Sequence, residues 1–130
     1  MNCFETMAHR WLTIKQCGDS LVPYFEDNLL HNIAIYGMGA LGGSLMRELK
    51  DTSINVCYGI DRRAAELSSP TWKVYDVSEE SYPLVDAICV TPAHDYYNIE
   101  KGLSHKDIPL ISLEDVIEYC YGKSCNSNMV

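Results

Sequence analysis

The chain has 130 residues, which suits a single domain and is too short for a cofactor-binding domain plus a separate catalytic domain of normal size. Its formal net charge of -8 at pH 7 argues against a nucleic-acid partner, because such proteins neutralise phosphates with clustered lysine and arginine. No stretch approaches the roughly 20 apolar residues of a membrane span, and the first residues lack the pattern of a signal peptide. We therefore expect a cytoplasmic protein without a membrane span.

The cysteines and histidines show no metal-binding or disulfide pattern. Six cysteines are spread along the chain without a C-x-x-C pair. This arrangement favours reduced, mostly buried thiols over a disulfide framework or a metal centre. The four histidines also lack the spacing of metal ligands, so we expect no metal site.

The N-terminal region has the pattern of two helices. Apolar residues recur at three- and four-residue spacing from residue 4 to residue 17, which predicts an amphipathic helix that stops at Gly18. Ser20 is placed to cap a second, short helix that continues to about Asn28. We assign residues 1–30 to an N-terminal helical extension.

A minimal nucleotide-binding domain does not need this extension, and two interpretations of it remain open. In one, both helices cover a face or an edge of the domain that follows. In the other, Trp11 and the pair Tyr24 and Phe25 form a dimer surface or dock onto a partner, because aromatic residues are favoured at interfaces. The second interpretation predicts a homodimer.

The rest of the chain is organised around a glycine motif. An apolar run over residues 33–36 predicts a buried strand, and Gly37, Gly39 and Gly42 follow it with the spacing G-x-G-x-x-G. Each glycine has a physical use: a tight turn, a close backbone approach to a pyrophosphate, and close packing of helix on strand. A helical run over residues 41–50 would direct its free N–H groups and positive dipole end at that phosphate.

A second predicted strand, residues 54–60, ends at an acidic residue. Asp61 lies nineteen positions after Gly42, close to the ~20 expected for a carboxylate that binds a ribose diol. Its charge would repel a 2′-phosphate and favour NAD over NADP. Arg62 and Arg63 leave NADP open, since an arginine at this point accommodates the additional phosphate.

Strand and helix patterns alternate through the remainder of the chain. We expect a short helical turn at 64–67, a strand at 72–75, a turn at 78–81, a strand at 85–90, a helix at 96–103, a strand at 109–112 and a helix at 113–121. This alternation predicts an α/β fold, a Rossmann-like doubly wound parallel sheet with strand order 3-2-1-4-5 preceded by two N-terminal helices. The nucleotide-binding domain would span residues 31–122, followed by a flexible tail over residues 123–130.

Thr91 and Pro92 end the fourth strand beside the point where the strand order reverses, which is where ligands bind in open α/β sheets. The Thr91 hydroxyl and nearby amides are candidates for contact with a ribose or phosphate. We interpret Asp95 as a helix cap, and His94 has no evident titratable partner for acid–base catalysis. The candidate ligand-binding residues are Gly37, Met38, Gly39, Ala40, Leu41, Gly42, Asp61, Arg62, Thr91 and Pro92.

The residues Ile35 to Gly42, with Ile60-Asp61, Val90-Thr91-Pro92 and Ile111 to Ile117, resemble small bacterial Rossmann-like domains associated with surface-polysaccharide biosynthesis and glycosyltransferase proteins. The resemblance implies an NAD(P)-like fold and a role near sugar-nucleotide metabolism. A related resemblance is to the N-terminal nucleotide-sugar-binding domain of sugar O- and N-acyltransferases, although their hexapeptide repeats are missing from this sequence. The glycine turn is also similar to that of prephenate dehydrogenases, which implies that Gly37, Gly39 and Gly42 hold NAD.

Together these features predict a nucleotide-binding module that holds NAD(H) or a nucleotide-sugar and acts with a glycosyltransferase or sugar-modifying partner. Two alternatives remain open. One is a small NAD-dependent oxidoreductase or sugar-nucleotide-modifying enzyme completed by a partner, and the other is a redox- or nucleotide-sensing regulatory domain. We expect no turnover of hydroxy acids, aldehydes or sugar nucleotides by the chain alone, because hydride transfer needs a substrate positioned against the nicotinamide.

Overall fold

The computed structural model describes residues 2–92, 96–103 and 107–124, and it is built on one all-parallel sheet. The strands are β1 (Asn32–Tyr36), β2 (Asn55–Ile60), β3 (Val74–Tyr75), β4 (Ala87–Val90) and β5 (Leu110–Ser112), in the order β3-β2-β1-β4-β5. At the centre of the sheet, Ile35 of β1 pairs with Gly59 on one side and with Cys89 on the other. The predicted α/β fold and strand order are confirmed, and the topology is Rossmann-like.

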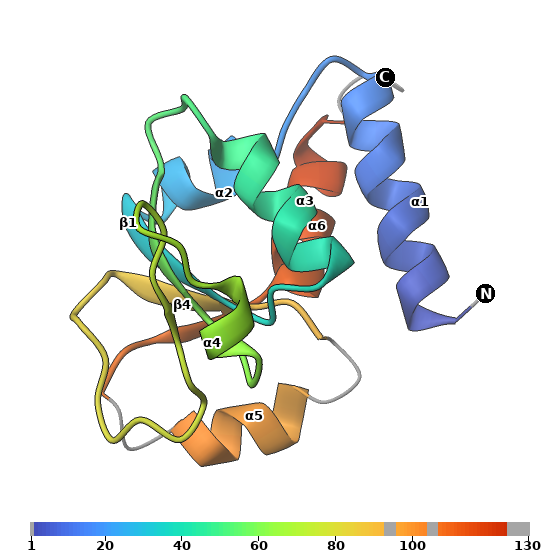
Figure 1. Ribbon diagram of the computed structural model, residues 1–130. Coiled ribbons are helices and arrows are strands. Elements are labelled where there is room, and N and C mark those ends of the chain that lie inside the picture. The colour runs from blue at the N-terminus through green and yellow to red at the C-terminus, as the bar shows by residue number, and fades with distance from the viewer. Residues whose placement is uncertain (1, 93–95, 104–106, 125–130) are drawn as a thin grey trace.

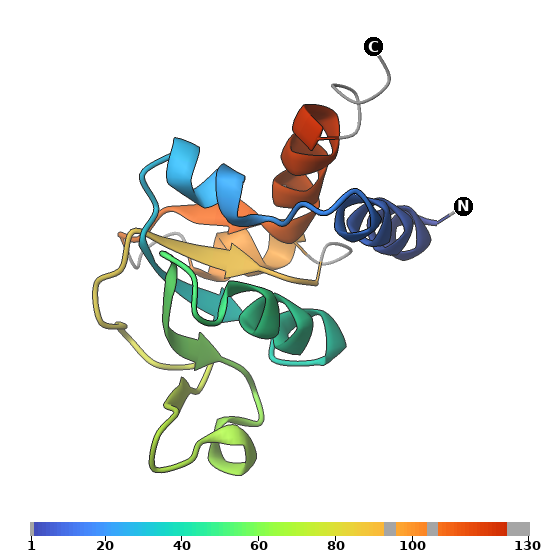
Figure 2. The same cartoon turned by 90° about the horizontal axis from the view of Figure 1, so that it is seen from above.

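Helices cover both faces of this sheet. They are α1 (Cys3–Gln16), α2 (Val22–Asp27), α3 (Ala40–Leu49), α4 (Ala64–Leu67), α5 (Tyr96–Leu103) and α6 (Leu113–Ser124). Figure 1 shows α2, α3 and α6 on one face and α5 on the other, while α1 lies outside α3 and α6. Figure 2 shows α4 beside β3, the edge strand of the sheet, at the opposite end of the view from α6. Among the described helices, none is both long enough and apolar enough to cross a membrane.

The N-terminal helices belong to the core of the domain. Met7, Trp11 and Ile14 of α1 are buried in the same cluster as the β1 residues Ile33 and Ile35. Burial of this apolar surface stabilises the docking of α1 against the body of the protein. Of the two interpretations of residues 1–30, the covering role is the one that the structure supports, and Met7 and Trp11 are not available as a dimer surface.

Glu48 of α3 anchors this arrangement. The periodicity of the helix, with Leu45 and Leu49 on its apolar face, predicts that Glu48 points to solvent, and the structure shows that this is wrong. Its side chain is only 5% exposed and lies close to Lys15, with 3.2 Å between Nζ and Oε1. Oε1 also accepts a hydrogen bond from Trp11 Nε1 at 3.1 Å, and Oε2 accepts one from the Leu21 N–H at 2.8 Å. One carboxylate therefore joins α1, the start of α2 and α3.

The second face of the sheet is covered by α5 and by a loop between β3 and β4, over residues 76–86. The Tyr58 hydroxyl donates to the Pro83 carbonyl at 2.7 Å, which ties this loop to β2. The Tyr82 hydroxyl makes contacts of 3.1 and 3.2 Å with the carbonyls of Asp76 and Val77. These tyrosines replace a covering helix and hold Val77 near the carboxyl ends of the strands.

Several predicted boundaries differ from those observed. The third strand is Val74–Tyr75, shorter than the predicted residues 72–75. The last helix continues through Gly122 to Ser124, because Lys123 donates a 2.6 Å hydrogen bond to Asp27 that offsets the ~1 kcal/mol cost of a helical glycine. Lys123 is therefore part of a helix and not of a tail, and residues 125–130 lie outside the described residues.

The start of α2 also departs from its prediction. The N-cap position of this helix is occupied by Leu21, one residue after the predicted Ser20. The Ser20 hydroxyl nevertheless accepts a hydrogen bond from the Val22 N–H at 3.2 Å, so it satisfies one of the donors at the helix start.

Candidate functional site

The turn between β1 and α3 has two positions that accept only glycine. Gly37 has φ +90°, and a Cβ built on it would lie 2.6 Å from Thr91 Oγ1. A Cβ on Gly42 would lie 2.0 Å from the Gly37 carbonyl oxygen. Both separations are far inside van der Waals contact, so the glycines allow β1, the turn and α3 to pack closely, as the motif predicts.

Gly39 differs from the other two glycines of the motif because a Cβ there would meet no described atom within 4 Å. Gly39 is the N-cap residue of α3, and among the described residues no side chain caps this helix. The N–H groups of Ala40, Leu41 and Gly42 form the first turn, where an α-helix has no internal acceptors for them. The site therefore combines open space above Gly39 with the positive end of a helix dipole.

Thr91 holds the glycine turn from the end of β4. Its hydroxyl lies 3.0 Å from the Tyr36 carbonyl and 2.9 Å from the Gly37 carbonyl, and its N–H donates to the Tyr36 carbonyl at 3.1 Å. The side chain is buried, with 3% of the residue exposed. The hydroxyl therefore fixes the turn, and its predicted contact with a ribose or phosphate stays a prediction.

Asp61 follows β2 and its carboxylate faces the glycine turn. Oδ2 accepts a 2.8 Å hydrogen bond from the Met38 N–H, and Oδ1 accepts one of 2.9 Å from the Arg63 N–H. Burial acts to raise the pKa of Asp61, but the N–H donors of Arg63 and Met38 together with the Arg63 guanidinium outweigh it, and the pKa lies below its ordinary value. The group is ionised at neutral pH, and a carboxylate with two such bonds retains lone pairs for further donors.

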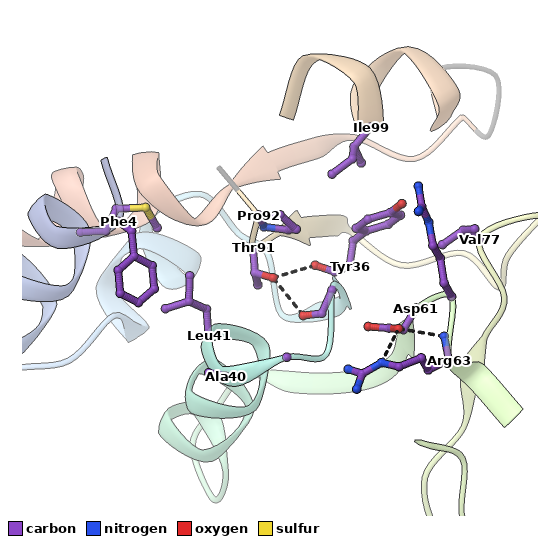
Figure 3. Close-up of a pocket in the computed structure, with 14 residues that line it drawn as sticks. Phe4, Tyr36, Ala40, Leu41, Asp61, Arg63, Val77, Thr91, Pro92 and Ile99 are labelled. Carbon is purple, nitrogen blue, oxygen red and sulfur yellow. Dashed lines mark hydrogen bonds and ion pairs between the residues drawn. The ribbon is translucent and has the colours of Figure 1, made fainter. Parts of the chain in front are cut away.

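These elements border one cavity of about 700 Å³, which lies within the range of small-molecule sites (Figure 3). Its lining contains eight of the predicted residues: Gly37, Gly39, Ala40, Leu41, Asp61, Arg62, Thr91 and Pro92. The other two predicted residues, Met38 and Gly42, do not line the cavity but support the residues that do. Met38 donates its N–H to Asp61 and packs its side chain over Gly59, and Gly42 brings α3 close to the turn.

Six further lining residues are missing from the predicted set: Phe4, Met7, Tyr36, Arg63, Val77 and Ile99. Tyr36 directly precedes the first glycine, so its place at the cavity follows from the motif. Arg63 was noted beside Asp61 for its charge alone. The sequence around Phe4 and Met7 does not indicate that they line this site, because only the docking of α1 places them there. His94 and Asp95 lie outside the described residues.

Comparison of the chain with protein-family models, with curated proteins and with solved structures found no match. Within the described part of the chain, no group of three or more histidine, cysteine, aspartate or glutamate side chains is placed to hold a metal ion. The polar groups that border the cavity include the first-turn N–H groups of α3, the Asp61 carboxylate, the two arginines after it and the Tyr36 side chain.

Proposed function

We propose that the chain is a nucleotide-binding module that holds a dinucleotide of the NAD(H) type in this cavity. The observation that carries the proposal is the open position over Gly39, at the uncapped start of α3 and in the same cavity as the ionised Asp61. An anion is stabilised at a helix N-terminus, and a carboxylate at the end of the second strand accepts hydrogen bonds from a ribose diol.

The residues present fit the parts of such a ligand. The N–H groups of Ala40 and Leu41 are available to a diphosphate, because the missing side chain of Gly39 leaves room for it. Asp61 has acceptor capacity for ribose hydroxyls. Arg63 lies 3.5 Å from Asp61 through its Nε and partly neutralises the carboxylate. When bound, NAD(H) supplies a hydride donor or acceptor.

The electrostatics of Asp61 favour binding over catalysis. A general base or acid works best when its pKa is near the operating pH, and hydrogen bonds hold the pKa of Asp61 below its ordinary, already acidic value. We propose that any reaction takes place with a second protein, in keeping with the predicted glycosyltransferase or sugar-modifying partner. The setting in surface-polysaccharide biosynthesis stays a prediction.

Titration calorimetry with the purified chain tests the proposal. We expect NAD(H) to bind more tightly than NADP(H), because Asp61 repels a 2′-phosphate. Asp61→Asn should weaken NAD(H) binding by about 1–3 kcal/mol, the range for a charged hydrogen bond left unmade. Glu80→Gln removes the same charge at an exposed position outside the cavity lining and should leave binding unchanged.

Two outcomes would redirect the proposal. Equal affinity for NAD(H) and NADP(H) would contradict the role given to Asp61. Tighter binding of a UDP-sugar than of either dinucleotide would favour the nucleotide-sugar alternative. Circular dichroism of Asp61→Asn separates loss of binding from loss of the turn, because Asp61 also accepts the Met38 N–H.

A further inference from the structure

The two ends of the cavity differ in chemistry. Figure 3 shows Asp61 and Arg63 on one side of the glycine turn and Phe4 with Leu41 on the other. The first end combines these charged groups with the side chains of Tyr36, Val77 and Ile99, which lie on the same side. The second end presents the hydrocarbon side chains of Phe4 and Leu41. Met7, three residues after Phe4 on α1, also belongs to the cavity lining.

The apolar end is formed by an element that a minimal nucleotide-binding domain does not contain. Phe4 and Met7 are three residues apart on α1 and so share a face of that helix. Met7 is 3% exposed and belongs to the core, whereas Phe4 is 57% exposed at the cavity. The apolar end is therefore a fixed wall whose outermost ring is open to a ligand.

Contacts between α1 and α3 fix the position of this apolar end relative to the turn proposed to bind phosphate. Leu41 lies in the first turn of α3, and Glu48 near the end of the same helix binds Trp11 of α1. The position of Phe4 relative to the first turn of α3 is thus set by contacts within the described core.

We propose that Phe4 is a specificity-determining residue, which selects a ligand whose far end is a flat, weakly polar ring, such as the reduced nicotinamide of NADH, over one that ends in a hexose. The inference rests on the proposed nucleotide site. A flat ring gains contact with an aromatic side chain. The hydroxyls of a hexose would lose water against the apolar side chains at this end, and burial of a polar group without a hydrogen bond is unfavourable.

Calorimetry on the full chain with ADP, ADP-ribose, NADH and UDP-glucose tests this. ADP-ribose shares every part of NADH except the nicotinamide ring. We expect NADH to bind about 3- to 10-fold more tightly than ADP-ribose, the factor that corresponds to one aromatic contact. Phe4→Ala should reduce NADH affinity to that of ADP-ribose and leave ADP-ribose within about twofold, since only the ring contact is removed.

Leu12→Ala is the matched control. Leu12 is on the same helix, is also 57% exposed and is not part of the cavity lining, so both affinities should stay unchanged. Equal binding of NADH and ADP-ribose to the wild-type chain would overturn the inference and leave the nucleotide site intact. Equal loss of both ligands in Phe4→Ala, or tighter binding of UDP-glucose than of NADH, would also overturn it. If ADP, ADP-ribose and NADH all fail to bind, the proposed function itself fails.

Discussion

Gly39 and Gly42 are three residues apart, yet an added methyl group would meet open space at the first and a backbone carbonyl at the second. Gly42 is part of the packing between α3 and the turn, whereas Gly39 faces the cavity. Substitutions at the two glycines therefore distinguish an effect on the stability of the fold from an effect on ligand binding.

Gly42→Ala should lower the free energy of unfolding by about 1–3 kcal/mol or more, because the backbone must move to relieve the contact with the Gly37 carbonyl. Gly39→Ala should change stability by less than about 1 kcal/mol, since Gly39 has φ -78° and an alanine can adopt it. The same substitution should weaken ADP binding at least ~10-fold, because its methyl group fills the space assigned to the diphosphate. Urea unfolding and calorimetry measure the two effects.

Gly102→Ala provides the control for these variants. Gly102 lies within α5 and a Cβ there would also meet no described atom within 4 Å. This variant should be more stable by ~0.4–1 kcal/mol, because alanine restricts the unfolded chain more than glycine does, without any change in ADP binding. Normal ADP binding by Gly39→Ala would show that the diphosphate does not lie over Gly39.

At the scale of single residues, the sequence predicted what depends on near neighbours along the chain. The conformation of Gly37 and the contact of Gly42 with its carbonyl occur within six residues, so the spacing alone indicates them. The role of Thr91 depends on the pairing of β4 with β1, which puts its hydroxyl beside carbonyls 54 and 55 residues away. The residues of one strand do not indicate which residues of a neighbouring strand will lie beside them.

At the scale of elements, α3 has a contact surface, around Glu48, that its own periodicity does not reveal. Its apolar residues indicate the face that packs on the sheet, and Glu48 falls outside that face. Because Trp11 and Lys15 of α1 reach this side of α3, a position that would otherwise be exposed is enclosed, and its carboxylate receives N–H donors from Trp11 and Leu21. Tertiary packing of a distant helix thus overrides the prediction for this residue.

Glu48→Ala should lower the free energy of unfolding by about 2–4 kcal/mol. It leaves the Trp11 and Leu21 N–H groups without their acceptor, and each unsatisfied buried donor costs about 1–3 kcal/mol. Arg47→Ala is the matched control at the preceding residue, which is exposed, and it should change the free energy of unfolding by no more than about 0.5 kcal/mol. Urea unfolding followed by tryptophan fluorescence measures both, and equal stabilities would refute the anchoring role of Glu48.

At the scale of the whole molecule, the alternation of strand and helix patterns was sufficient for the topology. Short parallel crossovers are almost always right-handed, so a correct list of elements leaves few arrangements. The placement of α1 was not predictable in the same way, since no crossover rule applies before the first strand. Its buried Met7 and Trp11 were consistent with either a dimer or a core, and the core contains them. The homodimer stays a prediction, without these two residues to support it.

Among the described residues, three carboxyl groups have a pKa below the ordinary value, and they contribute to the response of the molecule to acid. Hydrogen bonds from Lys123 and Tyr119 lower the pKa of Asp27, and the Ser78 hydroxyl and N–H lower that of Asp76. At Asp61 burial acts to raise the pKa, and the N–H donors of Arg63 and Met38 together with the Arg63 guanidinium lower it by more. A group whose pKa is lower in the folded state stabilises it above the unfolded-state pKa, and this contribution is lost as pH falls through the folded-state pKa.

Asp27 links α2 to α6 and should affect stability at both extremes of pH. The hydrogen bonds to Asp27 raise the pKa of Lys123 and of Tyr119, so their contribution is present below the unfolded-state values of about 10 and is lost as pH rises through the raised ones. The free energy of unfolding should therefore decline below pH ~4 and above pH ~10. Asp27→Asn should be less stable than wild type between these limits, and its free energy of unfolding should decline less steeply beyond each of them. Glu80→Gln, at an exposed position, should follow the wild-type curve. Urea unfolding across this pH range measures the curves, and parallel curves for Asp27→Asn and wild type would mean that the Asp27 bonds do not contribute in solution.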